Sequence, residues 1–567
     1  MVIVAAAVSL TLGYGHSKCC HLSWPVVSLS NLVFQLEART EGWVAMALSH
    51  TKSIKGADVV MGWVEASGQA TLRDLHSVDG RTVVEDESQD YELIVGYEEE
   101  GVTVVRFRRK VDTCDSDYDL PISNDTFRVI WAYSEADPPA GRTPQWSDLS
   151  RAGGRLLHLF QGEARDTLEP NLKRWVVTPN HVTLSEEATL YWCTMVKLPL
   201  MAEKHHMIGY IPKIQAGNER YVHHMMLYEC HDDRPEETFK RHVYKSGYKC
   251  YTPNMPEDFK KCRGIVAAWG LGGEPFHFPR EAGYPVGAQH GGSTYYMFEV
   301  HYENPGRHPN IADNSGLELL LTPNLRPHDS SMLTVGHDVS SLHLVPPGQL
   351  AFTTVAHCPS QCSQALPQEG ITVFAGLPHT HLLGIRVKLR HIRNGAELPT
   401  AFQDNHYDFN YQTMRKFEFH MLPGDHLITE CVYDTTGTEA YTRGGLSVNN
   451  EMCMAFLHYY PATALAHCVS KLPLKNILLA MGVTLWPIDP STRHLGLRVR
   501  TPNRFQNLTL SDYLTVVLPG DLDAAKRLQE ANLHHSQTAD CYEFGKKKVI
   551  AVSWGMVEEW WGCFVTP

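Results

Sequence analysis

Four short segments of the chain gather side chains that can bind a metal ion. Histidine nitrogen and methionine sulfur are ligands for transition metals, and the 567 residues include 31 histidines. The segments span residues 221–226, 298–302, 377–381 and 451–453. These residue types indicate metal binding, but scattered surface histidines would give the same total, so their positions must decide.

The spacing of His379 and His381 is the most favourable for shared binding. In a β-strand, positions i and i+2 point to the same face, so both imidazoles could converge on one ion. The pattern is common, however, and such pairs are more often solvated or buried in a core than bound to metal. Spacing alone leaves both alternatives open.

The other histidines are harder to interpret. Adjacent His223 and His224 point to opposite faces of a regular strand, so joint binding requires a bulge or a turned ring. His301 lies in an alternating strand and is by itself more typical of a core histidine than of a ligand. The pairs at 205–206 and 534–535 are also adjacent, and spacing does not rank the three pairs.

The elements that must position these residues are predicted to be strands. Short runs of β-branched and aromatic residues, separated by Gly, Pro, Asn and Asp, are typical of β-sandwich and jelly-roll domains. Helical patterns are scarce, with one near residues 521–532. The runs occupy residues 32–36, 42–48, 102–107, 127–133, 295–302, 371–375 and 385–389. We therefore predict an all-β fold.

The length of the chain predicts several domains. Residues 2–12 are apolar and are followed by small residues, as in a signal peptide, although a basic start is missing and a strand would look similar. No later segment has the roughly 18 apolar residues of a membrane-spanning helix. The expected divisions are a leader at 1–20, domains at 21–165, 180–346 and 347–512, and a C-terminal segment at 513–567.

Composition restricts the function class and the compartment. The net charge is 50 − 63 = −13 and no basic run occurs, which argues against a nucleic-acid partner. The 14 cysteines form no CxxC pair and are spread singly, as in a disulfide-bonded secreted protein, although scattered free thiols of a cytosolic enzyme would also fit. The glycosylation sequons at Asn124 and Asn507 favour the secretory pathway, whether the endoplasmic reticulum lumen, a vesicle or secretion.

The order of the four segments resembles the copper type II, ascorbate-dependent monooxygenases, in particular the dopamine β-hydroxylase-like branch. The matching motifs include Val-His-His-Met at 222–225, Glu-Val-His-Tyr at 299–302, His-Thr-His at 379–381 and Glu-Met-Cys at 451–453. Further likeness lies at 189–193, 404–407, 422–425, 445–447 and 458–461. The N-terminal third resembles a DOMON domain. The resemblance implies a DOMON β-sandwich followed by two jelly-roll copper domains.

The resemblance also implies a site and a reaction. Two coppers per chain would take electrons from ascorbate, bind O₂ and hydroxylate a C–H bond of a small-molecule substrate. The electron-storing copper would be held by His223, His224 and His301. The oxygen-binding copper would be held by His379, His381 and Met452. Imidazole suits both copper oxidation states, and a thioether favours Cu(I).

Two positions carry catalytic expectations from the same resemblance. His379 corresponds to a residue assigned as catalytic in relatives, and Tyr191 matches a tyrosine assigned near their active site. A structural role for Tyr191 stays open.

Departures from the peptide-amidating relative bear on the substrate. Leu377, Met454 and Phe456 stand where that relative has polar groups that hold a peptide carboxylate. An apolar trio would leave the carboxylate unpaired, which argues against peptide amidation and favours a neutral, aromatic or amine-bearing substrate.

The resemblance supplies a disulfide pattern that spacing cannot. The expected pairs are Cys193–Cys250, Cys230–Cys262, Cys358–Cys468, Cys362–Cys541, Cys431–Cys453 and Cys114–Cys563. Cys19 and Cys20 are left over, which fits an excised leader.

Two alternatives to the monooxygenase hypothesis remain at this stage. One is a catalytically silent, secreted copper- or ligand-binding relative whose DOMON domain does the recognition. The other is a zinc site, which accepts three histidines but for which methionine is a poor ligand. The sequence leaves a homo-oligomer open as well.

Overall fold

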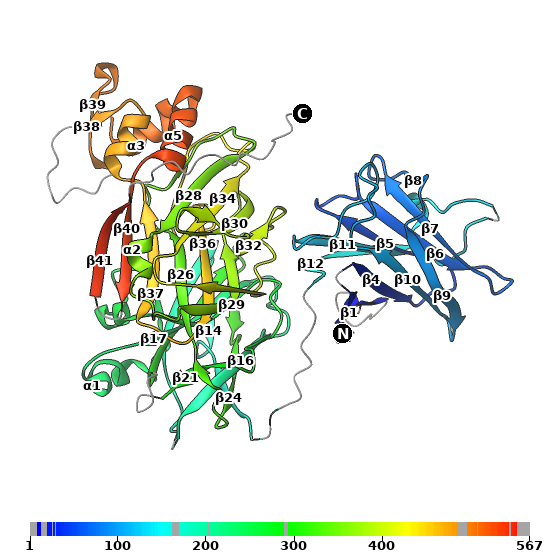
Figure 1. Ribbon diagram of the computed structural model, residues 1–567, viewed down its shortest axis with the longest axis horizontal. Coiled ribbons are helices and arrows are strands. Elements are labelled where there is room, and N and C mark those ends of the chain that lie inside the picture. Colours follow the sequence, from blue (N-terminus) through cyan, green and yellow to red (C-terminus); the bar gives the residue numbers. More distant parts are fainter. Residues whose placement is uncertain are drawn as a thin grey trace. The chain divides into compact units, whose positions relative to one another are not determined.

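The computed structural model of the chain consists mostly of β-strands and divides into two compact units, Met1–Thr167 and Leu168–Pro567. Figure 1 colours the strands of the first unit from blue to cyan and those of the second from cyan to red. The structure describes residues 8–12, 20–24, 26–28, 30–139, 141–160, 169, 171–201, 203–287, 293–485, 496–506, 508–543 and 546–552.

The first unit is a sandwich of two antiparallel sheets. One sheet has the order β1-β2-β4-β10-β9, with β3 against β4; its strands are β1 (Val8–Leu12), β2 (Cys20–Trp24), β3 (Val26–Ser28), β4 (Asn31–Ala38), β9 (Tyr91–Glu99) and β10 (Val102–Lys110). The other has the order β12-β11-β5-β6-β7-β8; its strands are β5 (Val44–Ser49), β6 (Asp58–Val64), β7 (Ala70–Ser77), β8 (Val83–Glu85), β11 (Phe127–Tyr133) and β12 (Arg151–Leu157).

Alternation of apolar residues explains the core of this sandwich. Because neighbouring side chains of a strand point to opposite faces, Leu32, Phe34 and Leu36 of β4 all enter the space between the sheets. They pack there with Phe107 of β10 and Val129 of β11, all of them buried. The expected leader overlaps this unit, since β1 pairs with β2 in antiparallel register.

The second unit begins with another two-sheet sandwich. One sheet contains β13 (Lys173–Val177), β16 (His205–Lys213), β20 (Phe276–His277), β21 (Ala282–Val286), β24 (Gly316–Thr322) and β25 (His328–Asp329). The sheet that matters for the site has the order β18-β15-β22-β17-β19; its strands are β15 (Thr189–Lys197), β17 (Val222–Cys230), β18 (Tyr248–Lys249), β19 (Cys262–Gly270) and β22 (Tyr295–Glu303). A short ladder joins β14 (Val182–Leu184) to β23 (Ile311–Asp313), and α1 spans Pro235–Phe239.

A third sandwich completes the second unit. Its larger sheet has the order β33-β29-β36-β26-β37-β40-β41; the strands are β26 (Ser331–His337), β29 (Ile371–His379), β33 (Arg415–Met421), β36 (Met454–Tyr460), β37 (Leu465–Lys471), β40 (Gln537–Glu543) and β41 (Lys546–Val552). The smaller sheet contains β28 (Phe352–Cys358), β30 (Gly384–Arg393), β31 (Ala396–Glu397), β32 (Phe402–Asp404) and β34 (His426–Tyr433). Short ladders join β27 (Leu344–Val345) to β35 (Thr442–Arg443) and β38 (Thr484–Leu485) to β39 (Val499–Thr501).

Helices are few in the described part of the chain, as predicted. Besides α1, the α-helices are α2 (Ser360–Ser363), α3 (Leu474–Ala480), α4 (Leu510–Asp512) and α5 (Leu522–His534). The helix expected near residues 521–532 is α5, and the side chain of Asp521 caps its start by accepting a hydrogen bond from the Ala524 amide.

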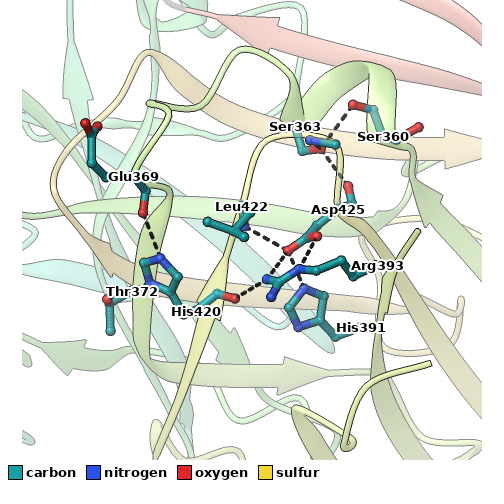
Figure 2. A network of polar contacts seen from close by, with 10 residues as sticks. Ser360, Ser363, Glu369, Thr372, His391, Arg393, His420, Leu422 and Asp425 are labelled. Carbon is teal, nitrogen blue, oxygen red and sulfur yellow. Dashed lines mark hydrogen bonds and ion pairs between the residues drawn. The ribbon is translucent and has the colours of Figure 1, made fainter. Parts of the chain in front are cut away.

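The Leu-Pro-Gly-Asp segment at 422–425 has a structural role, shown in Figure 2. The buried Asp425 carboxylate accepts hydrogen bonds from His391 Nε2 (2.7 Å), Arg393 Nε (2.8 Å) and the Leu422 amide (2.8 Å). Ser363 Oγ of α2 donates to the Asp425 carbonyl at 2.6 Å. The Asp425 carboxylate therefore joins the turn before β34 to strand β30. The Asp425 carbonyl joins the same turn to α2.

Five of the six expected disulfides are present in the structure. They are Cys193–Cys250, Cys230–Cys262, Cys358–Cys468, Cys362–Cys541 and Cys431–Cys453. The sixth pair involves Cys563, which lies outside the described residues, as do Cys19 and Asn507. Asn124 is exposed, as a glycosylation acceptor must be.

Candidate metal centre

Three histidines from two neighbouring strands meet at one point. Potential ligand atoms of His223, His224 and His301 all lie within 4.8 Å of one another. A register shift between β17 and β22 makes this meeting possible: Val222 pairs with Tyr302 and His224 with His301, so His223 is an extra residue. The bulge turns adjacent histidines, which a regular strand would point apart, toward the same place.

The ring nitrogens of this cluster have the spacing of ligands on one ion. His224 Nδ1 lies 3.2 Å from His223 Nδ1 and 3.3 Å from His301 Nδ1. A tetrahedral ion with bonds of about 2.0–2.1 Å to nitrogen holds its ligands about 3.3 Å apart. On the far side of its ring, His301 Nε2 lies 2.8 Å from Thr189 Oγ1, a contact that orients the ring.

The cluster is electrically suited to a cation. Burial lowers the pKa values of His223 and His301 well below the ordinary value for histidine. These two imidazoles are therefore neutral and keep lone pairs for a metal. His223 Nε2 is buried without a hydrogen-bond partner. The donor set therefore fits a copper ion, for which imidazole is a suitable ligand in both oxidation states.

The second predicted pair, His379 and His381, also comes together, with ring centroids 5.0 Å apart. The strand β29 ends at His379, so His381 lies just beyond it and not on the same strand face. His379 Nδ1 contacts Gln412 Oε1 at 2.6 Å and His381 Nδ1 contacts the Asn450 carbonyl at 3.1 Å. Because these acceptors occupy Nδ1, each ring keeps Nε2 for a metal.

Glu451 fixes the segment that carries Met452. Its buried carboxylate accepts backbone hydrogen bonds from His381 (3.0 Å), Leu383 (2.7 Å) and Met452 (3.2 Å). One carboxylate thus joins the histidine segment to the methionine segment. Burial raises the pKa of Glu451 to about 7 and lowers the pKa of His379 to about 4.

Both groups of residues face one cavity of about 1010 Å³. His224, His379, His381 and Met452 all line it, and the rings of His224 and His379 are 6.4 Å apart.

The apolar trio of the sequence analysis lines the same cavity. Leu377, Met454 and Phe456 are all buried and belong to one apolar cluster with Met452. The wall next to the second group of residues is therefore apolar.

Tyr191 has a positioning role in this structure. Its ring stacks on His301 with centroids 4.0 Å apart and planes 8° from parallel. Its hydroxyl donates a hydrogen bond to the Leu446 carbonyl, and burial raises its pKa further above the ordinary value. The tyrosine thus packs against one histidine cluster and is tied to the segment that precedes Met452.

Two residues at the site were not identified from the sequence. Phe409 stacks on His223 with centroids 4.4 Å apart, and Gln412 orients His379. Both lie between β32 and β33, after the family-like stretch at 404–407 but outside it, and only the fold brings them to the site.

The other adjacent histidine pairs lie elsewhere. His206 Nε2 contacts Asp329 Oδ1 at 2.8 Å, and His205 Nδ1 contacts the Glu203 carbonyl at 2.8 Å. His534 ends α5. None of these histidines lines the cavity.

Comparison with known proteins gives the family. Residues 175–309 match the N-terminal domain of the copper type II ascorbate-dependent monooxygenases and residues 328–479 match the C-terminal domain. Residues 16–134 match the DOMON domain. The chain belongs to the copper type II ascorbate-dependent monooxygenase family. Copper and ascorbate are the cofactors of this oxidoreductase family, and the all-β fold carries a DOMON domain and two copper monooxygenase domains in this order.

Curated relatives include DBH-like monooxygenase protein 1 of Mus musculus, which is 38% identical over 85% of this chain and 78% of its own. The sequence motifs predict a strong likeness to DBH-like monooxygenase protein 2, but the mouse protein of that name is 32% identical over 80% of this chain and 72% of its own, less than mouse DBH-like monooxygenase protein 1. Dopamine beta-hydroxylase of Canis lupus familiaris is 32% identical over 80% of this chain and 71% of its own. Among the described residues, no helix has the length and apolar character needed to span a membrane.

Proposed function

We propose that the chain is a copper monooxygenase that hydroxylates a C–H bond of a small substrate with O₂ and ascorbate. The observation that carries the proposal is that two separate groups of metal-binding side chains face one cavity. One oxygen atom would enter the product and the other would leave as water, with two electrons from ascorbate and two protons completing the balance.

Two copper ions per chain would occupy the cavity wall. His223, His224 and His301 would hold one ion, and His379, His381 and Met452 the other. Bound copper supplies one-electron redox chemistry and activation of O₂. The protein residues do the rest: Thr189, Gln412 and the Asn450 carbonyl orient the histidine rings, and burial keeps the rings in the neutral form that binds metal.

The cavity favours a substrate with an apolar, aromatic or amine-bearing body. Leu377, Met454 and Phe456 present no polar atom that could pair with a substrate carboxylate, so burying one beside them would be costly. Relatives named dopamine beta-hydroxylase and tyramine beta-hydroxylase support an aromatic amine.

The compartment is proposed to be the secretory pathway. Five disulfides require an oxidising environment to form and persist. The exposed Asn124 sequon is available for glycosylation there.

The test is oxygen uptake by the copper-loaded chain secreted from cells, with ascorbate and a panel of phenethylamine, 2-phenylethanol and a glycine-extended peptide. We expect ascorbate-dependent uptake and a hydroxylated product with one or both aromatic compounds, and none with the peptide. Met452→Ala should abolish product formation. Copper binding without any product across an extended panel of hydrophobic compounds would contradict the proposal and favour a silent copper-binding relative.

A further inference from the structure

One buried carboxylate faces the cavity close to the histidine cluster. Glu299 and His301 are two positions apart on β22, so their side chains share one face of the sheet, about 7 Å apart along the strand. Glu299 lines the cavity although its side chain is only 2% exposed. Its register partner on β17 is Met226, which lines the cavity as well. An acidic side chain therefore belongs to the inner wall, next to the proposed metal ligands.

The two oxygens of this carboxylate have different surroundings. The Tyr251 hydroxyl donates a hydrogen bond to Glu299 Oε2. Oε1 lies 3.6 Å from His224 Nε2, which is longer than a hydrogen bond, and it accepts no hydrogen bond from the residues that the structure describes. Because a buried charge is costly unless it is paired, Oε1 is suited to accept hydrogen bonds from a cationic ligand.

No lysine or arginine of the described chain forms an ion pair with Glu299. Arg263 lines the same cavity but lies toward the other end of β19. Ala268, the residue opposite Met226, is five positions along the strand from Arg263, roughly 17 Å away. Two other carboxylates of the cavity have lysine partners of their own, in the pairs Glu257–Lys260 (2.7 Å) and Asp338–Lys471 (2.6 Å). Glu299 thus faces the cavity without a fixed positive charge beside it.

Aromatic rings lie near the same carboxylate. Tyr191, Tyr228 and Tyr251 all line the cavity, and the rings of Tyr191 and Tyr251 have centroids 6.1 Å apart and planes at 67°. Burial, followed by the negative charge of Glu299, raises the pKa of Tyr191 and Tyr228 above the ordinary value, which shows that both phenols are close to the carboxylate. A carboxylate together with the electron-rich faces of aromatic rings is the combination that recognises an ammonium group.

We propose that Glu299 binds the protonated amine of the substrate, with the rings of Tyr228 and Tyr251 beside it. The inference rests on the proposed function and names the residue that makes an amine the preferred substrate. Met226 and Tyr228 pack against the apolar cluster that contains Met452. A substrate with its ammonium group at Glu299 can therefore lay an apolar body against the wall next to the second group of metal-binding residues.

Amine recognition can be measured apart from catalysis. The full-length chain is used without copper, because a free amine can itself bind copper. Phenethylamine is a cation at neutral pH, whereas 2-phenylethanol is neutral and has the same aromatic body. Ligand-observed NMR gives the affinity for each compound. We expect the wild type to bind phenethylamine about tenfold more tightly than 2-phenylethanol, and Glu299→Gln to remove this preference by weakening the amine alone.

Two further variants complete the experiment. Glu257→Gln is the matched control, because it removes the same charge from a carboxylate that also lines the cavity but is paired with Lys260. It should leave both affinities unchanged. Tyr251→Phe removes the hydroxyl that holds Glu299 Oε2 and should weaken phenethylamine binding about threefold, with no effect on 2-phenylethanol.

Three results would overturn the proposal. The first is a wild type that binds phenethylamine no more tightly than 2-phenylethanol, or not at all. The second is unchanged amine affinity in Glu299→Gln, and the third is equal weakening of both compounds, which would give Glu299 a purely structural role. If Glu299→Gln does not fold, an unchanged amine preference in Tyr251→Phe would overturn the proposal in its place.

These measurements involve neither copper nor turnover, so the two proposals fail separately. A chain that binds phenethylamine through Glu299 but hydroxylates no compound would contradict the proposed function alone. A chain that hydroxylates aromatic compounds and shows no preference for the amine would contradict the role of Glu299 alone.

Discussion

Two regions of the molecule each bring three potential metal ligands within 4.8 Å of one another, and the chemistry of the two regions differs. In the second unit these are His223, His224 and His301; in the first unit they are Asp58, Asp74 and Asp119. In the histidine cluster, burial lowers the pKa of His223 and His301 well below the ordinary value, and His223 Nε2 has no partner. The aspartates instead enclose a cation of the chain itself: Arg109 Nη2 lies 2.7 Å from Asp58 Oδ2 and 3.4 Å from Asp119 Oδ2.

The difference shows that proximity of ligand types does not distinguish a metal site from a structural charge cluster. The aspartate cluster depends on Arg109 and on the Tyr91 hydroxyl, which donates to Asp58 Oδ1 at 2.8 Å. In the histidine cluster, burial lowers the pKa of His223 and His301, and His224 lines a cavity. The aspartates should therefore govern the stability of the first unit. The histidines should govern the response of the second unit to metal.

The largest effect should follow removal of the internal cation. Arg109→Met leaves buried carboxylates uncompensated and should lower the unfolding free energy of the first unit by about 3–5 kcal/mol. Calorimetry of the full chain measures this change. Arg108→Met is the control, because Arg108 forms an exposed pair with Glu92 and should cost less than about 1 kcal/mol. Equal effects of the two substitutions would contradict the assignment of Arg109 as a structural cation.

The aspartate cluster should also make the first unit pH-sensitive. Burial raises the pKa of Asp74 to about 8, far above the ordinary 3.8, so the folded state keeps a proton that the unfolded state has lost. This contribution to stability is fully present below pH 4 and is lost as the pH rises to 8. Between pH 5 and pH 8 the unfolding free energy should fall by on the order of 3 kcal/mol. Denaturant midpoints at pH 5 and pH 8 test this, and Asp74→Asn should reduce the difference. A midpoint that is independent of pH would show that Asp74 ionises normally.

The histidine cluster should respond to metal instead. At a free copper concentration 100 times its dissociation constant, one site adds about 2.7 kcal/mol to the unfolding free energy. His223→Ala should lose most of the increment at its own site while changing the metal-free chain much less than Arg109→Met changes the first unit. Thermal unfolding with and without copper separates the loss of the copper-dependent increment from the effect of the substitution on the metal-free chain. An undiminished response to copper in His223→Ala would remove this residue from the ligand set.

The smallest effect is expected at an unpartnered histidine that is not a ligand. Both ring nitrogens of His458 are buried without a partner, and its ring stacks on Phe276 and Phe374 with centroids 5.3 and 5.7 Å away. His458→Phe should be neutral or stabilising by up to about 1 kcal/mol, because it removes the cost of burying two polar atoms. The copper content should not change. Loss of copper in this variant would mean that the ligand assignment is incomplete.

Much of the fold follows from local patterns. The run at residues 127–133 is strand β11 and the pattern at 521–532 lies in helix α5, because alternation and helical spacing are local properties. Alternation along β22 also predicts the face on which His301 lies. Phe298 and Val300 enter the core of the sandwich, and His301 points to the opposite face.

Other features depend on tertiary structure. Alternation along β10 places Arg109 on the core face with Val105 and Phe107, but it does not show which carboxylates surround its guanidinium. The β-bulge at His223 and the approach of Phe409 and Gln412 arise where separate strands and segments meet. No local pattern encodes these contacts, so the candidate site could be predicted from family resemblance and only in part from spacing.

The most direct test of the account is the copper content of the protein secreted from cells, measured with His301→Ala and Met452→Ala beside the wild type. The account predicts two coppers per wild-type chain, with each variant weakening one site and leaving the other intact. One copper or none in the wild type, or loss of both coppers in a single folded variant, would contradict two separate metal sites.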